Sequence, residues 1–473
     1  MRSTSTRRDF LRAFAATTVA GALGQRARAA AGGGGKPNVL FIYTDDQRED
    51  TVSALGNPHI KTPNLDAIVQ GGFVFRNAYC MGGFSAAVCL PSRMMTLRGR
   101  GWFRVRNLPK GFANFPTSMK QAGYETFHLG KKGNTDQQVH KLFDHNAYVS
   151  RSPQPGKPLA DGTIAFLKGR KKDRPFFIYL AGPAPHDPRV APKAYMDMYD
   201  VAKMPLPPNY LPFHPFDNGE MFIRDEKLAP WPRTKDEIRR HLRDYYAMIT
   251  HLDAQLGRIF QTLKDLGQYD NTIIVFASDQ GIAIGSHGLM GKQNLYEGSM
   301  GVPLIFAGPG VPKGKESPAL AYLFDIFPTV CDLVGAPVPA ELDGKSLAPV
   351  MRGRSSEVRD TIFLAYKDLQ RAVRRGKWKL LRYPKVNVTQ LFDLEVDPCE
   401  TKDLAGDPKH AAKVKELLAV MAEQQKLYGD TAPLTVANAK DGTVDLEFFR
   451  KPPPRRKKNP KPKPNKRSRK NAK

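Results

Sequence analysis

Cysteine, histidine and long apolar runs are scarce in this chain of 473 residues, and each shortage excludes a class of protein. Four cysteines are too few for a disulfide framework at this length, so a hydrophobic core has to hold the fold together. The ten histidines lack the spacing of a zinc site. An apolar stretch near residues 10–23 is too short to cross a bilayer core of about 30 Å. The cysteines are Cys80, Cys89, Cys331 and Cys399.

The first 36 residues contain the three parts of an export signal in the expected order. Residues 6–11 (TRRDFL) form a twin-arginine pattern, the apolar stretch follows, and Ala27-Arg28-Ala29 is a small-residue cleavage site. Two adjacent arginines can also arise by chance in a basic amino terminus. We predict that residues 1–36 are a Tat-type signal peptide and spacer. Because the Tat machinery exports folded proteins, the mature chain would act in the periplasm or outside the cell.

Acidic residues are outnumbered by basic ones, 46 against 73, and the excess is concentrated at the carboxyl end. Residues 450–473 carry 13 Lys or Arg and no acid, interleaved with proline, so this stretch cannot form a core. We predict a disordered basic tail over residues 441–473. It could be a solvated segment, or it could attract polyanions such as sulfated polysaccharide, the cell surface or nucleic acid. No recognised nucleic-acid motif accompanies it, so no specific nucleic-acid partner is expected.

Short apolar runs alternate with helical patterns between residues 37 and 350, the predicted catalytic domain. Strands are predicted at residues 38–43, 73–78, 125–129, 175–180, 271–276 and 303–306. Helices are predicted at residues 115–122, 234–266 and 325–334, with another opening at Thr62-Pro63. Such alternation predicts an α/β fold with a large, mostly parallel sheet covered by helices on both faces.

The pattern changes after about residue 350. Residues 351–440 show three short predicted strands, 361–366, 371–374 and 378–383, and then a helix at 409–427. This order is typical of a small α+β subdomain at the carboxyl end.

Polar side chains follow three of the predicted strands. Asp45 and Asp46 follow the first strand, His186 follows the strand at 175–180, and Asp279 and Gln280 follow the strand at 271–276. Sites in α/β sheets lie beyond the carboxyl ends of strands. Either polar pair alone could be a helix cap or a solvated turn. Two such pairs favour a hard cation, because Ca²⁺ and Mg²⁺ prefer carboxylate and amide oxygens.

The run CLPSRMMTLRG at residues 89–99 begins with a cysteine at the predicted start of a helix. Pro91 suits a first helical turn, because its missing N–H is among the donors that the turn leaves free. Cys89 could be inert packing. The run resembles the type I sulfatase signature C-x-P-S-R-x-x-x-L-T-G, with Arg98 in place of the threonine. The resemblance implies that a formylglycine-generating enzyme converts Cys89 into formylglycine (3-oxoalanine), the catalytic nucleophile of that family.

The resemblance spans about residues 37–430 and is to bacterial sulfatases of the iduronate-2-sulfatase and choline-sulfatase type, with the alkaline-phosphatase-like fold. It implies a bound Ca²⁺, with Mg²⁺ as the alternative. The metal ligands that it implies are Asp45, Asp46, Cys89 in its modified form, Asp279 and Gln280. The catalytic residues that it implies are Cys89, Arg93, Lys131, His186 and Lys292.

The resemblance also gives these residues tasks. Arg93 would support the formylglycine and the metal, and Lys131 and Lys292 would hold sulfate oxygens. His186 would donate a proton to the leaving alcohol. His287 could bind substrate, although a structural role in its loop is an equal alternative.

The loop after Lys131 departs from the family pattern. The histidine expected two or three residues later is replaced by Gly133 or Asn134. In the family this histidine is thought to help regenerate the aldehyde. His128, three residues before Lys131, is the nearby alternative.

The sequence therefore predicts an exported sulfatase that hydrolyses a sulfate ester, most readily on a sulfated carbohydrate. Two other functions stay open. The chain could be a phosphodiesterase or phosphonate monoester hydrolase of the same superfamily, some members of which share the modified cysteine. It could also be a catalytically silent protein that keeps the fold and binds sulfated glycans.

Overall fold

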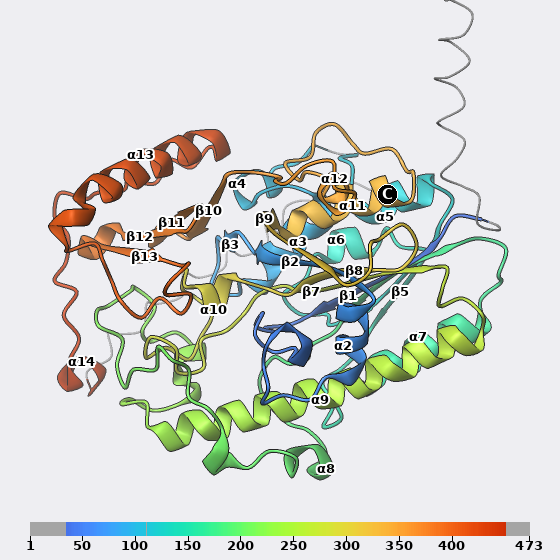
Figure 1. Cartoon of the computed structure of the whole chain (residues 1–473), viewed down its shortest axis with the longest axis horizontal. Helices are drawn as coiled ribbons and strands as arrows, with labels where there is room; N and C mark the ends of the chain where they lie inside the picture. Colours follow the sequence, from blue (N-terminus) through green and yellow to red (C-terminus); the bar gives the residue numbers. More distant parts are fainter. Residues whose placement is uncertain (1–34, 110, 451–473) are drawn as a thin grey trace, which may run out of the picture.

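The computed structural model describes residues 35–109 and 111–450, and an eight-stranded sheet forms its centre (Figure 1). The strand order is β5-β4-β6-β1-β7-β8-β2-β9. β8 runs antiparallel to both of its neighbours, β7 and β2, and the other pairs are parallel. The predicted large, mostly parallel α/β sheet is confirmed. Its strands are β1 (Asn38–Thr44), β2 (Gly72–Tyr79), β4 (Glu125–Gly130), β5 (His145–Tyr148), β6 (Phe176–Ala181), β7 (Thr272–Ser278), β8 (Leu304–Ala307) and β9 (Lys315–Tyr322).

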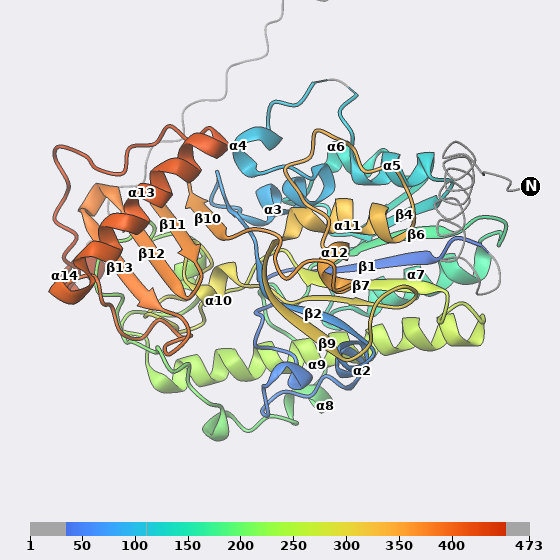
Figure 2. The same ribbon diagram turned by 45° about the horizontal axis from the view of Figure 1, so that its top comes forward.

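Both faces of this sheet are covered by helices, which explains the unbroken apolar runs of its central strands. In β1, Phe41 and Tyr43 belong to one hydrophobic core and Leu40 and Ile42 to the other. On the first face lie α3 (Cys89–Arg98), α5 (Phe115–Gln121) and α11 (Ile326–Leu333). On the second lie α2 (Pro63–Gln70), α7 (Lys157–Gly169) and α9 (Lys235–Asp265), seen below the sheet in Figure 2.

The carboxyl-terminal part forms a second, five-stranded sheet in the order β13-β12-β11-β10-β3. Helix α13 (Ala411–Tyr428) packs on it. Its edge strand β3 is only Gly82–Gly83, contributed by the catalytic part and parallel to β10. A Cβ on Gly82 would lie 2.1 Å from the Ala365 carbonyl oxygen, so only glycine allows this contact between the two parts. The other strands are β10 (Thr361–Tyr366), β11 (Gln370–Arg375), β12 (Trp378–Tyr383) and β13 (Val388–Asp393).

Several elements were not predicted from the sequence. β5 has a polar, mostly exposed sequence, and β9 contains a proline, so neither has the apolar pattern of a buried strand. Short helices complete the described chain. They are α4 (Trp102–Val105), α6 (Gln137–His140), α8 (Lys193–Met196), α10 (Glu297–Met300), α12 (Ala348–Met351) and α14 (Leu446–Arg450), with 3₁₀ turns η1 (Ser53–Leu55), η2 (Val201–Lys203), η3 (Asp225–Leu228), η4 (Leu323–Asp325), η5 (Pro384–Val386) and η6 (Pro408–His410).

The predicted disordered tail begins too early at residue 441. The structure places helix α14 within it, because Phe448 and Phe449 supply aromatic surface that packs against the hydrophobic core. Residues 451–473 and the predicted signal peptide at 1–34 lie outside the described residues. Among the helices of residues 35–109 and 111–450, none combines the length and the apolar character that a membrane span requires.

Candidate active site

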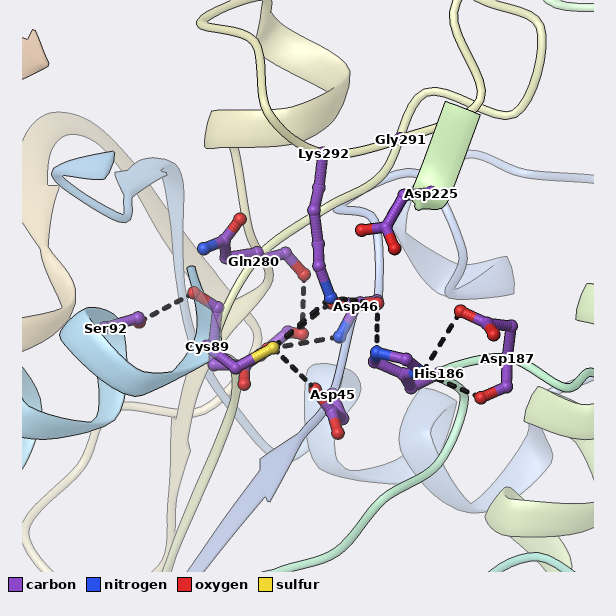
Figure 3. Close-up of polar contacts among 12 residues, drawn as sticks. Asp45, Asp46, Cys89, Ser92, His186, Asp187, Asp225, Gln280, Gly291 and Lys292 are labelled. Atoms are coloured by element: carbon purple, nitrogen blue, oxygen red, sulfur yellow. Dashed lines mark hydrogen bonds and ion pairs between the residues drawn. The ribbon is translucent and has the colours of Figure 1, made fainter. Parts of the chain in front are cut away.

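Three aspartates and one cysteine meet at the carboxyl edge of the central sheet (Figure 3). Asp45 and Asp46 follow β1, Asp279 follows β7, and Cys89 begins α3. One potential ligand atom from each lies within 4.8 Å of the others, and all four residues are buried. The Cys89 Sγ atom lies 3.1 Å from Asp45 Oδ1 and 3.8 Å from Asp46 Oδ1. β1 and β7 are adjacent and parallel, which brings the two strand ends together.

Helix α3 is fixed against this edge by residues of the CLPSRMMTLRG run itself. Arg93 donates from Nε to Asp279 Oδ2 at 2.8 Å, and its side chain is fully buried. The Ser92 hydroxyl donates to the Asp279 carbonyl oxygen at 2.7 Å, and Tyr43 contacts the Ser92 hydroxyl at 3.1 Å. Breaking one partner of a buried charge pair leaves the other uncompensated. The motif therefore both presents Cys89 and holds one of the carboxylates beside it.

Two lysines neutralise the carboxylates. Lys292 donates from Nζ to both oxygens of Asp46 at 2.6 Å, and the same Nζ lies 3.3 Å from Cys89 Sγ. Lys131 follows β4 and binds Asp45 Oδ2. Burial acts to raise the pKa of Asp45, but Lys131 and other nearby cations bring that pKa well below its usual range. The structure thus brings both lysines to residue 89, and their contact with sulfate stays a prediction.

His186 faces the cluster from the segment after β6. Its Nδ1 donates to the Asp187 carbonyl oxygen at 2.8 Å, which directs Nε2 towards Asp46 Oδ2, 3.7 Å away. The Asp187 carboxylate lies 3.2 Å from Nδ1 and is ion-paired with Arg224. A protonated His186 would therefore face negative charge on both sides, which suits a proton donor.

The loop that carries Lys292 is held by a buried carboxylate. Glu226 accepts the backbone N–H groups of Met290 at 2.9 Å and Gly291 at 2.8 Å, and it pairs with Arg233 at 2.7 Å. Sequence reasoning missed Glu226, Arg224 and Asp187. Only Asp187, next to His186, carried a local signal. The other two act across long separations in the sequence.

Gln280 supplies the observation that fits a metal ion best. Its side chain is fully buried, and neither its amide oxygen nor its amide nitrogen has a hydrogen-bond partner in the described part of the chain. Buried amides are normally paired, so an unpaired one beside three carboxylates needs a ligand. Carboxylate and amide oxygens are the donors that Ca²⁺ and Mg²⁺ prefer. The residues present therefore fit a hard cation.

Burial and the aspartates also affect the cysteine. Burial first, and then Asp279 and Asp45, raise the pKa of the Cys89 thiol well above its ordinary value. A cysteine nucleophile needs its thiolate, which such surroundings disfavour. An unmodified Cys89 is therefore poorly suited to attack an anionic ester.

His287 is not brought into the cluster. Within the described residues its ring stacks on Tyr296 with centroids 3.7 Å apart, and its Nε2 lies 3.0 Å from Asn209 Nδ2. Burial, together with His214 and Lys379, lowers the pKa of His287 to about 2, so the ring is neutral. These contacts favour the structural alternative over a contact with sulfate.

The loop after Lys131 gives no histidine to the cluster within the residues that the structure describes. Asn134 is exposed and has a left-handed φ of 53°. His128 is buried, stacks on His140 at 3.8 Å, and contacts Asn146 through Nδ1 at 2.8 Å. Burial lowers the pKa of His128 to about 4. Neither residue stands where a histidine could serve the aldehyde.

The two departures from the family motif touch each other. Arg98, at the end of α3, donates from Nε and Nη2 to the carboxylate of Asp136 at 2.6 and 3.0 Å. Asp136 lies in the loop after Lys131 and caps α6 by accepting the Val139 N–H at 3.3 Å. The helix that presents Cys89 therefore also anchors the loop that follows Lys131.

We expect Asp136→Asn to lower the free energy of unfolding by about 3 kcal/mol, because it leaves the buried Arg98 charge uncompensated. Urea titration measures this change. Asp197→Asn, which breaks the exposed pair with Lys193, is the matched control and should cost less than about 1 kcal/mol. Equal costs for the two variants would show that the Arg98–Asp136 pair has no special role.

The fold and this cluster define the class of protein: an ester hydrolase of the alkaline-phosphatase-like superfamily. The family model described as "Sulfatase" matches residues 37–336, and that described as "N-sulphoglucosamine sulphohydrolase, C-terminal" matches residues 285–427. The chain belongs to the sulfatase family and is a sulfuric ester hydrolase.

Named relatives share this architecture over most of their length. An N-acetylglucosamine-6-O-sulfatase of Bacteroides thetaiotaomicron is 26% identical, with 84% of this chain and 88% of the relative covered. An arylsulfatase of Clostridium perfringens is 27% identical, with 82% and 94% covered. A solved structure in complex with its substrate D-glucosamine-2-N,6-O-disulfate has a TM-score of 0.70 and 25% identity, with 85% and 99% covered.

Proposed function

We propose that the chain is an exported sulfatase that removes sulfate from a sulfated carbohydrate, using a formylglycine made from Cys89 and a bound divalent cation. The observation that carries this proposal is the cluster of Asp45, Asp46, Asp279 and residue 89 beside Lys292. Two relatives support the carbohydrate class, since one is named for an N-acetylglucosamine sulfate and another is solved with a glucosamine disulfate.

The cation would be held by Asp45, Asp46, Asp279, Gln280 and the modified residue 89, and the carboxylates favour Ca²⁺ with Mg²⁺ as the alternative. When bound, the metal would stabilise negative charge on oxygen, and the formylglycine would supply the nucleophile in place of a thiolate. Both the formylglycine-generating enzyme and the Tat machinery are proposed partners. The proposed location is the periplasm or the outside of the cell.

The chain's own residues provide the rest of the chemistry. Lys292, 3.3 Å from Cys89 Sγ, and Lys131 would bind the oxygens of a sulfate seated at residue 89, offsetting charge as it develops. Arg93 keeps Asp279 in place through the 2.8 Å ion pair. His186 holds its Nε2 towards the cluster, where it would give a proton to the leaving alcohol.

The phosphonate monoester alternative has a structural counterpart, because a phosphonate monoester hydrolase from Silicibacter pomeroyi shares the fold with a TM-score of 0.69. At 24% identity this likeness concerns the fold alone. A phosphonate places a carbon group where sulfate places an oxygen. A buried lysine facing that carbon would lack a hydrogen-bond partner, which costs binding energy.

We therefore expect kcat/KM for 4-nitrophenyl sulfate to exceed that for phenyl 4-nitrophenyl phosphonate by at least about a hundredfold. Both substrates release 4-nitrophenol, so one absorbance assay on the matured protein compares them. A preference for the phosphonate would transfer the function to the alternative. Turnover of neither, with residue 89 modified, would favour the silent glycan-binding protein.

A further inference from the structure

Helix α14 is fastened to a segment of the catalytic part by aromatic stacking. Phe449 stacks on Trp231 with centroids 4.2 Å apart and lies 5.5 Å from Phe213. Phe448 lies 5.1 Å from Phe222. Just before the helix, the Gly442 carbonyl oxygen accepts the backbone N–H of Asp217 at 2.8 Å. The end of the described chain is thus held by residues 213–231, next to which it lies in Figure 1.

The same segment reaches the active site. The guanidinium of Arg233 lies 3.5 Å from the centre of the Trp231 ring and pairs with Glu226, which fixes the backbone next to Lys292. Arg224 pairs with Asp187, the neighbour of His186, while 55% of its side chain stays exposed. Residues 213–233 therefore run from the anchored helix to the solvent-exposed rim beside His186.

The sequence places dense positive charge directly after this anchor. Of the 13 Lys or Arg at residues 450–473, Arg450 ends α14, so 12 follow it without one acid. Charges of one sign attract polyanions from solution, and this attraction is screened over about 8 Å at physiological ionic strength. Its effect on the active site is therefore strongest if the basic segment starts close to the rim.

We propose that α14 holds the basic segment beside the rim so that the segment binds a sulfated polysaccharide whose own sulfate ester enters the active site. The proposal rests on the proposed function and adds that the substrate is polymeric. A chain that binds at two linked points gains from the high effective concentration of the second contact. A nucleic acid would meet the basic segment alone, because it presents phosphodiesters and no sulfate ester.

The test uses hydrolysis of 4-nitrophenyl sulfate by the full chain, with dextran sulfate as a competitor. We expect removal of residues 451–473 to raise the half-inhibitory concentration of dextran sulfate about tenfold or more at low salt. The difference should shrink as salt is raised. The double variant Phe448→Ala/Phe449→Ala keeps every tail charge and should also weaken inhibition, although by less than the truncation.

Two controls separate this proposal from the proposed function. Turnover of 4-nitrophenyl sulfate without competitor, and inhibition by glucose 6-sulfate, should be the same in all three proteins. If uncompeted turnover is absent, the proposed function fails. If turnover is normal but the truncation leaves dextran sulfate inhibition unchanged, the tail proposal fails.

Two further results would also overturn the tail proposal. Unchanged inhibition in the Phe448→Ala/Phe449→Ala variant would remove α14 as the anchor. Duplex DNA that competes as strongly as dextran sulfate at equal charge would show that the segment attracts polyanions in general.

Discussion

Replacing Cys89 with alanine is expected to lower kcat/KM for an aryl sulfate by about 10⁴-fold or more, the scale seen when a covalent nucleophile is lost. The side chain lies 3.1 Å from Asp45 and 3.3 Å from Lys292, so no other described residue occupies its position. The measurement is initial-rate kinetics on protein made together with a formylglycine-generating enzyme. The tryptic peptide that carries residue 89 is weighed in parallel.

The peptide should show the mass loss expected when a thiol is replaced by an aldehyde. Cys399→Ala is the matched control, because this half-buried cysteine lies outside the cluster, and its activity should match that of the parent. Substantial activity in Cys89→Ala would remove residue 89 as the nucleophile. An unmodified cysteine in spite of a competent maturation enzyme would point to Arg98 as a motif change that blocks recognition.

Asp279→Asn is expected to lower kcat/KM by about 10³-fold and to abolish stabilisation by Ca²⁺. The change keeps the shape of the side chain but removes the charge that pairs with Arg93 at 2.8 Å. Its other oxygen accepts the Asp46 N–H at 3.1 Å, so the carboxylate also orders the first pair of ligands. The readouts are kinetics and the shift in Tm when Ca²⁺ is added to chelator-treated protein, since a ligand that binds only the folded state raises Tm.

Asp253→Asn supplies the comparison for this experiment. Asp253 is also buried and accepts the backbone N–H of Leu65 at 2.7 Å, but it lies outside the cluster. Its replacement should lower Tm and leave the Ca²⁺-dependent shift in place. A Ca²⁺ shift that persists in Asp279→Asn would show that the cation binds elsewhere.

Much of the central sheet was predictable, because strands such as β1 and β7 are buried on both faces and read as unbroken apolar runs. The edge strand β5 was not, since its residues are polar and largely exposed. The long helix α9 was predictable within one residue at each end. Thr234 caps it by accepting the Glu237 N–H, and a regular apolar stripe faces the sheet.

The active site was predicted better than its supports. Asp45, Asp46, Asp279 and Gln280 follow strands, and a strand end fixes a residue's place at the edge of the sheet. His287 shows the limit of this reasoning. It lies in the right loop, yet Tyr296 and Asn209 hold its ring away from the cluster. Such contacts depend on partners that sequence spacing does not reveal.

By itself, the sequence determined the parallel-sheet class, the identity of residue 89 and the chemical types of the groups around it, because periodicity and motifs are local properties of the chain. Only the tertiary structure decided that Arg98 binds Asp136, that Glu226 fixes the Lys292 loop, and that Phe449 seats α14 on Trp231. These contacts join residues between 38 and 218 positions apart. Their existence depends on how the packed layers bring distant segments together, and no local pattern encodes that.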